Sequence, residues 1–206
     1  LYNTLLSGIA MDGKSFFYVN PLEVWPENCL PRTAMEHVKP VRQKWFGVAC
    51  CPPNIARTLA SMGQYMYSVS EDTLFVNLYI ANESEVDVNG GTLKAVLESR
   101  YPDEGHMKFT VQDGPETCTV AFRIPGYVKK FSLKRNGIEI SGVTVEKGYV
   151  YLKASSGDCF ELEFDLTPRF VRANSHVRAD EGKVALMKGP MVYCLEQQDN
   201  GENLAG

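Results

Sequence analysis

The hydrophobic pattern changes its period near residue 70, and this change constrains the fold more than any other feature. Before residue 70 the apolar residues recur at helical spacing, as in Leu1, Leu5 and Ile9. A second helix is predicted from about Pro53 to about Val69, because a proline suits a first helical turn, where the missing N–H has no partner. The first 70 residues are therefore expected to be helical and irregular.

Two shorter stretches complete this first part of the chain. Residues 15–20, SFFYVN, are predicted to form a short strand between polar or turn-forming residues. Residues 21–48 contain four prolines and are predicted to be mostly loop.

After residue 70 apolar and polar residues alternate, which is typical of strands with one buried face. Turn sequences such as NGG at 89–91 and RNG at 135–137 separate the alternating runs. Many short strands without intervening helices predict a mainly β fold, an antiparallel β-sandwich of the jelly-roll kind. The predicted strands are 73–80, 108–111, 117–123, 131–135, 149–153, 159–166, 169–174, 183–189 and 191–196. The pattern thus divides the chain into 1–70, a sandwich at 71–198, and a polar tail or linker at 199–206.

Composition excludes several classes of protein. Of the 206 residues, 44% are hydrophobic and 22% are charged, as in ordinary globular proteins. A formal net charge of −4 gives no basic surface for nucleic acid or an anionic membrane, and no apolar run is long enough for a transmembrane helix. Residues 1–10 do not resemble a signal peptide, and a first residue Leu1 suggests a piece of a longer protein. The compartment, cytoplasmic or periplasmic, is left open.

The segment WFGVACCPPN, residues 45–54, contains the candidate chemistry. Cys50 and Cys51 are adjacent and directly precede the predicted proline-led helix. The amide groups and dipole of a helix N-terminus stabilise a thiolate, and nucleophilic attack and metal ligation both need a thiolate. Two buried thiols in a tight turn would give the same sequence, so the residues alone leave both interpretations open. The isolated Cys118, Cys159 and Cys194 are predicted to be buried thiols.

Three runs of sequence resemble glycoside hydrolase family 127, the β-L-arabinofuranosidases. They are DGKSFFYVNPLE at 12–23, WFGVACCPPNIARTLASMGQYMYS at 45–68, and KVALMKGPMVYCLE at 183–196. The resemblance implies a retaining glycosidase whose catalytic domain is an (α/α)6 barrel followed by β-sandwich domains. Residues 1–70 would then be a helical remnant at the end of the barrel, and 71–198 a sandwich that supports the barrel or forms an interface, including one in a homodimer.

The resemblance also assigns roles to residues. It implies that Cys50 is the nucleophile and a zinc ligand, and that Cys51 is a second zinc ligand. A third cysteine, a zinc-binding glutamate and an acid/base glutamate would belong to the N-terminal barrel, upstream of this chain. Zinc is therefore expected in the intact parent protein and expected to be absent or incompletely held in this chain, which is expected to be inactive alone.

The substrate implied by the resemblance is a carbohydrate, a β-L-arabinofuranoside. Tyr18 matches a family position that hydrogen-bonds the sugar, and Trp45 is a candidate for stacking on a sugar face. For each, packing in the core or in the barrel wall is the alternative. A second function is a non-catalytic carbohydrate-binding or structural sandwich, because Tyr149 and Tyr151 alternate onto one face of a strand.

Overall fold

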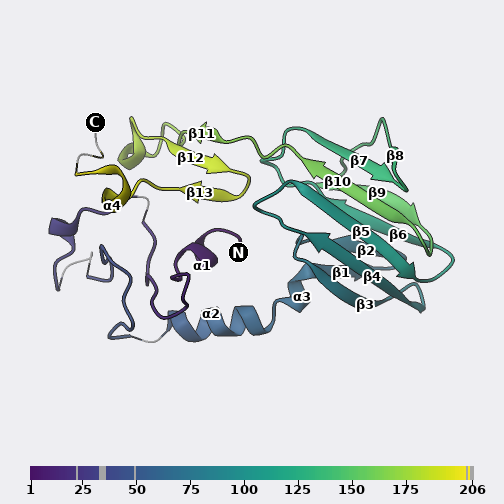
Figure 1. Cartoon of the computed structure of the whole chain (residues 1–206), viewed down its shortest axis with the longest axis horizontal. Helices are drawn as coiled ribbons and strands as arrows, with labels where there is room; N and C mark the ends of the chain where they lie inside the picture. Colours follow the sequence, from purple (N-terminus) through teal and green to yellow (C-terminus); the bar gives the residue numbers. More distant parts are fainter. Residues whose placement is uncertain (22, 33–35, 49, 203, 205–206) are drawn as a thin grey trace. The chain divides into compact units, whose positions relative to one another are not determined.

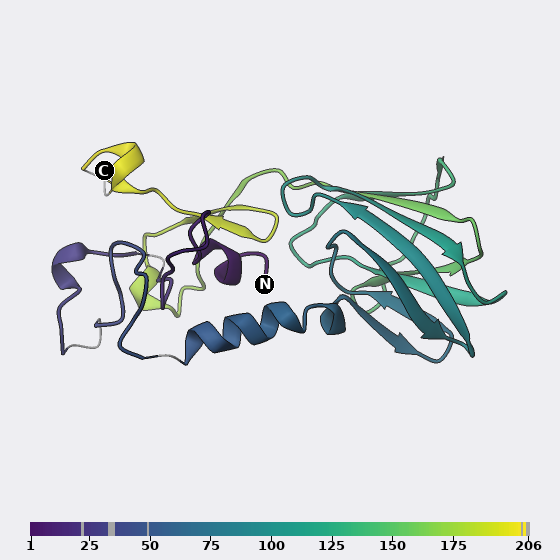
Figure 2. The same ribbon diagram turned by 60° about the horizontal axis from the view of Figure 1, so that its bottom comes forward.

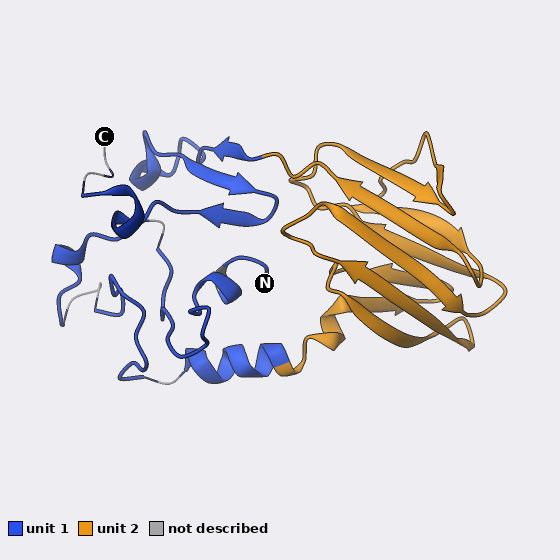
Figure 3. Ribbon diagram, viewed as in Figure 1, with its two compact units in different colours: residues 1–59, 168–206 blue, residues 60–167 orange. Residues whose placement is uncertain are grey.

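A computed structural model describes residues 1–21, 23–32, 36–48, 50–202 and 204. The chain forms two compact units, one of residues 1–59 and 168–206 and one of residues 60–167, coloured separately in Figure 3. Within the described residues, none of the helices has both the length and the apolar character needed to cross a membrane.

The unit of residues 60–167 consists of two β-sheets, whose strands are visible in Figures 1 and 2. The four-stranded sheet has the order β1 (Tyr67–Ser70), β2 (Thr73–Val76), β6 (Cys118–Arg123) and β9 (Tyr149–Ala154). The six-stranded sheet has the order β3 (Asn82–Val88), β4 (Gly91–Ser99), β5 (His106–Asp113), β10 (Cys159–Phe164), β7 (Phe131–Arg135) and β8 (Ile138–Glu139).

Alternation along the strands builds the core between these sheets. Leu74, Val120 and Val150 of the four-stranded sheet are buried, with at most 2% of each residue exposed. The ring of Phe122 contacts those of Phe109 and Phe160 from the six-stranded sheet, with centroids 5.5 and 5.4 Å apart. Because side chains alternate between the faces of a strand, residues 75, 121 and 151 point away from this core.

The predicted mainly β, antiparallel fold is confirmed, with one local exception. Strands β2 and β6 pair in parallel, from Thr73 with Thr119 to Val76 with Phe122, while the other strand pairs are antiparallel. The jelly-roll arrangement of the strands stays a prediction.

The last three strands do not join the sandwich, which the sequence pattern extends to residue 198. β11 (Arg169–Val171), β12 (Ala185–Lys188) and β13 (Met191–Tyr193) form a separate sheet in the unit of residues 1–59 and 168–206. Period-two alternation identifies a strand and its buried face, but it does not identify which sheet the strand joins. A one-turn helix, α4 (Gln197–Asn200), overlaps the predicted polar tail at 199–206, of which residues 203, 205 and 206 lie outside the described residues.

The helices of the first part are shorter than the pattern predicts. α1 covers Thr4–Ser7, and α2 covers Cys51–Ala60 instead of reaching residue 69. A short α3 (Gly63–Met66) follows, and Tyr67–Ser70 forms β1 because it pairs with β2. Gly63 lowers the stability of a continuous helix, and residues 67–70 pair with β2 instead of continuing the helix.

The predicted strand at 15–20 is not present as a strand, and within this segment only Phe16 forms β-bridges. Phe16 forms antiparallel bridges with Ile9 and with Gln43. Two 3-10 turns, Pro26–Asn28 and Arg178–Asp180, interrupt the loops of this unit.

Candidate active site

The two adjacent cysteines lie at the N-terminus of α2. Cys51 is the first helical residue and Cys50 directly precedes it, as the proline-led start of the helix predicts. The amide nitrogen of the Asn54 side chain donates a hydrogen bond to the carbonyl oxygen of Cys50 at 2.6 Å. Arg57 in turn donates to the side-chain oxygen of Asn54 at 3.1 Å, so the first turn of the helix fixes the backbone that carries Cys50.

Tyr18 reaches Cys50 from a distant part of the sequence. Its hydroxyl oxygen is hydrogen-bonded to the sulfur of Cys50, although 32 residues separate the two. The backbone explains the approach, because Phe16 exchanges two hydrogen bonds of 3.0 Å with Gln43 and so pairs the segment of Tyr18 with the segment that leads to the cysteines.

The ring of Tyr18 is held by two other rings. His37 stacks on it with centroids 5.1 Å apart and an interplanar angle of 30°, and Phe46 contacts it at 5.3 Å. Phe46 is buried, and its ring also contacts Phe16 at 5.2 Å. These contacts fix the ring of Tyr18 so that its hydroxyl is directed at Cys50.

The hydrogen bond changes the acidity of both partners. The Tyr18 hydroxyl, and secondarily the Cys51 thiol, lower the pKa of Cys50 below the usual range of a cysteine. The same contact with Cys50, followed by that with Cys51, raises the pKa of Tyr18. Both shifts favour a protonated phenol that donates to a Cys50 thiolate over the reverse arrangement, and Cys50 is exposed, so its sulfur is accessible to a reactant.

The cysteine pair has a spacing that suits a shared metal ion. The sulfur atoms of Cys50 and Cys51 are 3.9 Å apart. Two thiolates bound to one tetrahedral zinc, each about 2.3 Å from the metal, are about 3.8 Å apart. Among the described residues no group of three or more His, Cys, Asp and Glu side chains could hold a metal. Cys50 and Cys51 could therefore offer at most two thiolate ligands, and a complete metal site would need further ligands from elsewhere.

The structure brings together three of the four residues selected from the sequence. Cys50, Cys51 and Tyr18 form one cluster, but Trp45 makes none of the ring contacts recorded for the described residues and is 62% exposed. The cluster also contains His37, which was not among those four residues and belongs to it through its stacking on Tyr18. No sequence signal marks His37, because it lies in a loop 19 positions from Tyr18 and without a local motif.

Comparison with known proteins covers nearly the whole chain with models of one family. The catalytic-domain model of the GH127 β-L-arabinofuranosidases matches residues 1–64, the middle-domain model matches 73–167, and the C-terminal-domain model matches 168–206. The chain belongs to glycoside hydrolase family 127. The last two matches meet at the boundary between the two compact units, which also lies between residues 167 and 168.

Individual relatives agree with this assignment. The chain is 42% identical to a non-reducing end β-L-arabinofuranosidase of Bifidobacterium longum, over 99% of the chain and 32% of that protein. A GH127 β-L-arabinofuranosidase structure from Geobacillus stearothermophilus T6 matches 97% of the chain with a TM-score of 0.87 and 45% identity. A second GH127 β-arabinofuranosidase structure matches 96% with a TM-score of 0.83 and 35% identity. The chain spans about a third of the length of each of these relatives.

Proposed function

We propose that this chain carries the nucleophile of a retaining glycoside hydrolase that acts on β-L-arabinofuranosides. The observation that supports the proposal most is the hydrogen bond from Tyr18 to an exposed Cys50 at the start of α2. This contact favours a thiolate where nothing in the described structure covers it. The names of the GH127 relatives supply the substrate class.

Cys50 would perform the first half of the reaction. Its thiolate attacks the anomeric carbon, a C–S bond forms, and the glycosidic C–O bond breaks. The leaving oxygen takes a proton from a general acid, which typically contributes about 10²–10⁴-fold to the rate. No residue of this chain is assigned as the general acid, which would therefore belong to a part of the protein outside this chain.

The second half restores the cysteine. Water attacks the anomeric carbon from the face that the leaving group vacated, the C–S bond breaks, and the thiolate is released. Retaining glycosidases usually use a carboxylate as the nucleophile, so Cys50 takes the place of that carboxylate. Tyr18 assists both halves, because its hydroxyl stabilises the negative charge on sulfur whenever the C–S bond is absent.

Zinc fits the same pair of cysteines. When bound, the ion would lower the pKa of both thiols, so that Cys50 would be a thiolate without first giving its proton to another base. The spacing of 3.9 Å between the sulfur atoms of Cys50 and Cys51 supports this assignment, and the remaining ligands would come from a part of the protein outside this chain, which spans about a third of its relatives' length. The sandwich of residues 60–167 would support that part or an interface of a homodimer.

The proposal is tested by comparing the chain with a longer protein that contains it. We expect the longer protein to release the aryl alcohol from an aryl β-L-arabinofuranoside and the isolated chain to release none above background. Cys50→Ser in the longer protein should abolish release, while Cys194→Ser, which changes another exposed cysteine, should leave it unchanged. Activity of the isolated chain within about tenfold of the longer protein would contradict the assignment, because the missing acid alone is worth more than that.

A further inference from the structure

The outer face of the four-stranded sheet carries a cluster of aromatic rings unrelated to the cysteines. Phe75 of β2 contacts Tyr149 and Tyr151 of β9, with ring centroids 5.2 and 6.0 Å apart, and the two tyrosine rings are 6.4 Å apart. We call Phe75, Tyr149 and Tyr151 the aromatic platform. All three residues belong to the unit of residues 60–167.

The register of the sheet explains why these rings meet. Ala121 of β6 pairs with Phe75 on one side and with Tyr151 on the other, so the three residues form one row on the outer face. Ala121 places only a methyl group between the two rings and is itself fully buried. Tyr151 is 38% exposed, and Phe75 and Tyr149 are half-buried. The three rings therefore form an aromatic surface that is accessible to solvent.

Hydrogen-bonding groups border the platform on one side. The Tyr149 hydroxyl donates to the side-chain oxygen of Asn77 at 2.8 Å, and the Asn77 amide nitrogen donates to the Ser68 hydroxyl at 3.1 Å. The exposed guanidinium of Arg123 lies in the same row of the sheet as Tyr149. Donors and acceptors are therefore present beside the rings, and the ring of Tyr149 is fixed before any ligand arrives.

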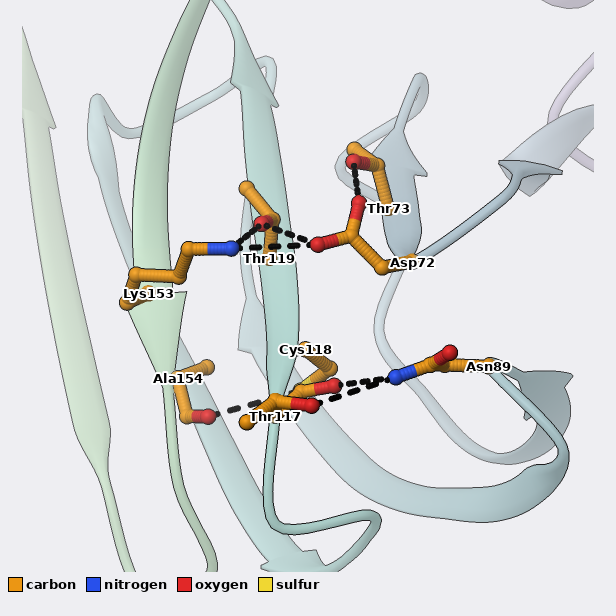
Figure 4. A network of polar contacts seen from close by, with 8 residues as sticks. All are labelled: Asp72, Thr73, Asn89, Thr117, Cys118, Thr119, Lys153 and Ala154. Carbon is orange, nitrogen blue, oxygen red and sulfur yellow. Dashed lines mark hydrogen bonds and ion pairs between the residues drawn. The ribbon is translucent and has the colours of Figure 1, made fainter.

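A second polar group borders the platform on the opposite side, shown in Figure 4. The Lys153 amine lies 3.0 Å from a carboxylate oxygen of Asp72 and donates to the Thr119 hydroxyl at 2.9 Å. Thr73 donates to the other carboxylate oxygen of Asp72 at 3.0 Å. Lys153 and Asp72 neutralise each other, so this border offers polar contacts without a net charge.

We propose that this face of the four-stranded sheet is a binding site for an uncharged glycan, separate from the site at Cys50. One face of a sugar ring presents C–H groups, which pack on aromatic rings, and its edge presents hydroxyls, which need both donors and acceptors. The aromatic platform provides ring surface for the C–H groups, and its two borders provide donors and acceptors for the hydroxyls. The charges of Lys153 and Asp72 balance and Arg123 adds a single positive charge at the other border, so the site lacks the cluster of cations that a polyanion would need and suits a neutral sugar.

The rigidity of the cluster favours binding. Ring contacts and the hydrogen bond to Asn77 already fix the rings, so the side chains of the platform lose little conformational entropy when a ligand binds. If the longer protein acts on polymeric or clustered arabinosides, a second sugar site raises the local concentration of substrate without a new contact at the catalytic residue.

The test is affinity electrophoresis of the chain in gels containing soluble linear arabinan, dextran or polygalacturonate. We expect a neutral polymer to retard the wild type and Tyr151→Ala to weaken this binding about tenfold. Tyr193→Ala is the matched control, because Tyr193 is an exposed tyrosine of the separate three-stranded sheet, and it should bind as the wild type does. Cys50→Ser should also bind normally, which separates this site from the proposed catalytic one.

Several outcomes would overturn the proposal. They are retardation by polygalacturonate alone, no retardation by either neutral polymer, equal losses in Tyr151→Ala and Tyr193→Ala, and a wild-type dimer that Tyr151→Ala dissociates in sedimentation. If Tyr151→Ala does not fold, NMR of the wild type titrated with arabino-oligosaccharides replaces it. Shifts at Phe75, Ala121 and Tyr151 would then support the site, and shifts confined to residues outside the four-stranded sheet would refute it.

Discussion

The core of the sandwich can be tested at Phe122, the residue that joins its two sheets. Phe122 is fully buried and contacts one ring from β5 and one from β10, at 5.5 and 5.4 Å. Truncation of a buried phenylalanine to alanine costs about 3–5 kcal/mol, and each aromatic contact accounts for about 0.5–1.5 kcal/mol of that. We therefore expect Phe122→Ala to lower the free energy of unfolding by about 4 kcal/mol, a large share of the about 5–15 kcal/mol typical of a domain.

Urea denaturation followed by far-UV circular dichroism measures this change, because most strands belong to residues 60–167. Phe170→Ala is the matched control, since its ring is 74% exposed and its removal should cost no more than about 0.5 kcal/mol. A cost below about 1 kcal/mol for Phe122→Ala, or one equal to that of Phe170→Ala, would refute the assignment of the core.

Three further predictions concern acidity and metal binding. Tyr18→Phe removes the main cause of the lowered pKa of Cys50, so alkylation of Cys50 by iodoacetamide should shift to higher pH; an unchanged pH profile would remove Tyr18 from the site. Burial raises the pKa of the Asp158 carboxyl, but hydrogen bonds from the side chains of Arg135 and Asn136 and from a backbone N–H outweigh it, and the net pKa is lowered. The stability that ionised Asp158 provides is therefore fully present above its unfolded pKa of about 3.9 and is lost as the pH falls through its folded pKa. The difference in urea midpoint between the wild type and Asp158→Asn should then become smaller in acid. A difference that becomes larger would disprove this. Zinc should bind the isolated chain weakly, because Cys50 and Cys51 supply only two ligands; metal analysis after dialysis that finds one tightly held zinc per chain would contradict this unless copies share ligands.

The sequence predicts the sandwich well because its strands alternate strongly. β10 buries every second residue, β6 buries five of its six residues, and turn sequences such as NGG bound the hairpins. Both β3 and β4 are absent from the predicted strands. Six of the seven residues of β3 are only partly buried or exposed, so its apolar signal is weak. β4 buries Leu93, Ala95 and Leu97 in alternation, so its pattern was present in the sequence and the prediction missed it. The sheet joined by the last three strands depends on long-range pairing, which a local pattern does not encode.

The site was only partly predictable for the same reason. The position of Cys50 and Cys51 at a helix start follows from local chemistry, since the prolines after them suit a first turn. The approach of Tyr18 depends on backbone pairing between Phe16 and Gln43, and the stacking of His37 depends on a loop, so neither follows from spacing. The resemblance to the family selected Tyr18, and nothing in the sequence selected His37.

The most direct test of the proposed mechanism is to identify the residue that becomes covalently attached to the sugar. A longer protein containing this chain is mixed with an aryl β-L-arabinofuranoside, quenched in acid within the first turnover, digested and analysed by mass spectrometry. The account predicts that the peptide containing Cys50 gains the mass of one pentosyl group, and that this adduct and the release of aryl alcohol both disappear in Cys50→Ser. An adduct on a carboxylate, or full activity in Cys50→Ser, would contradict it.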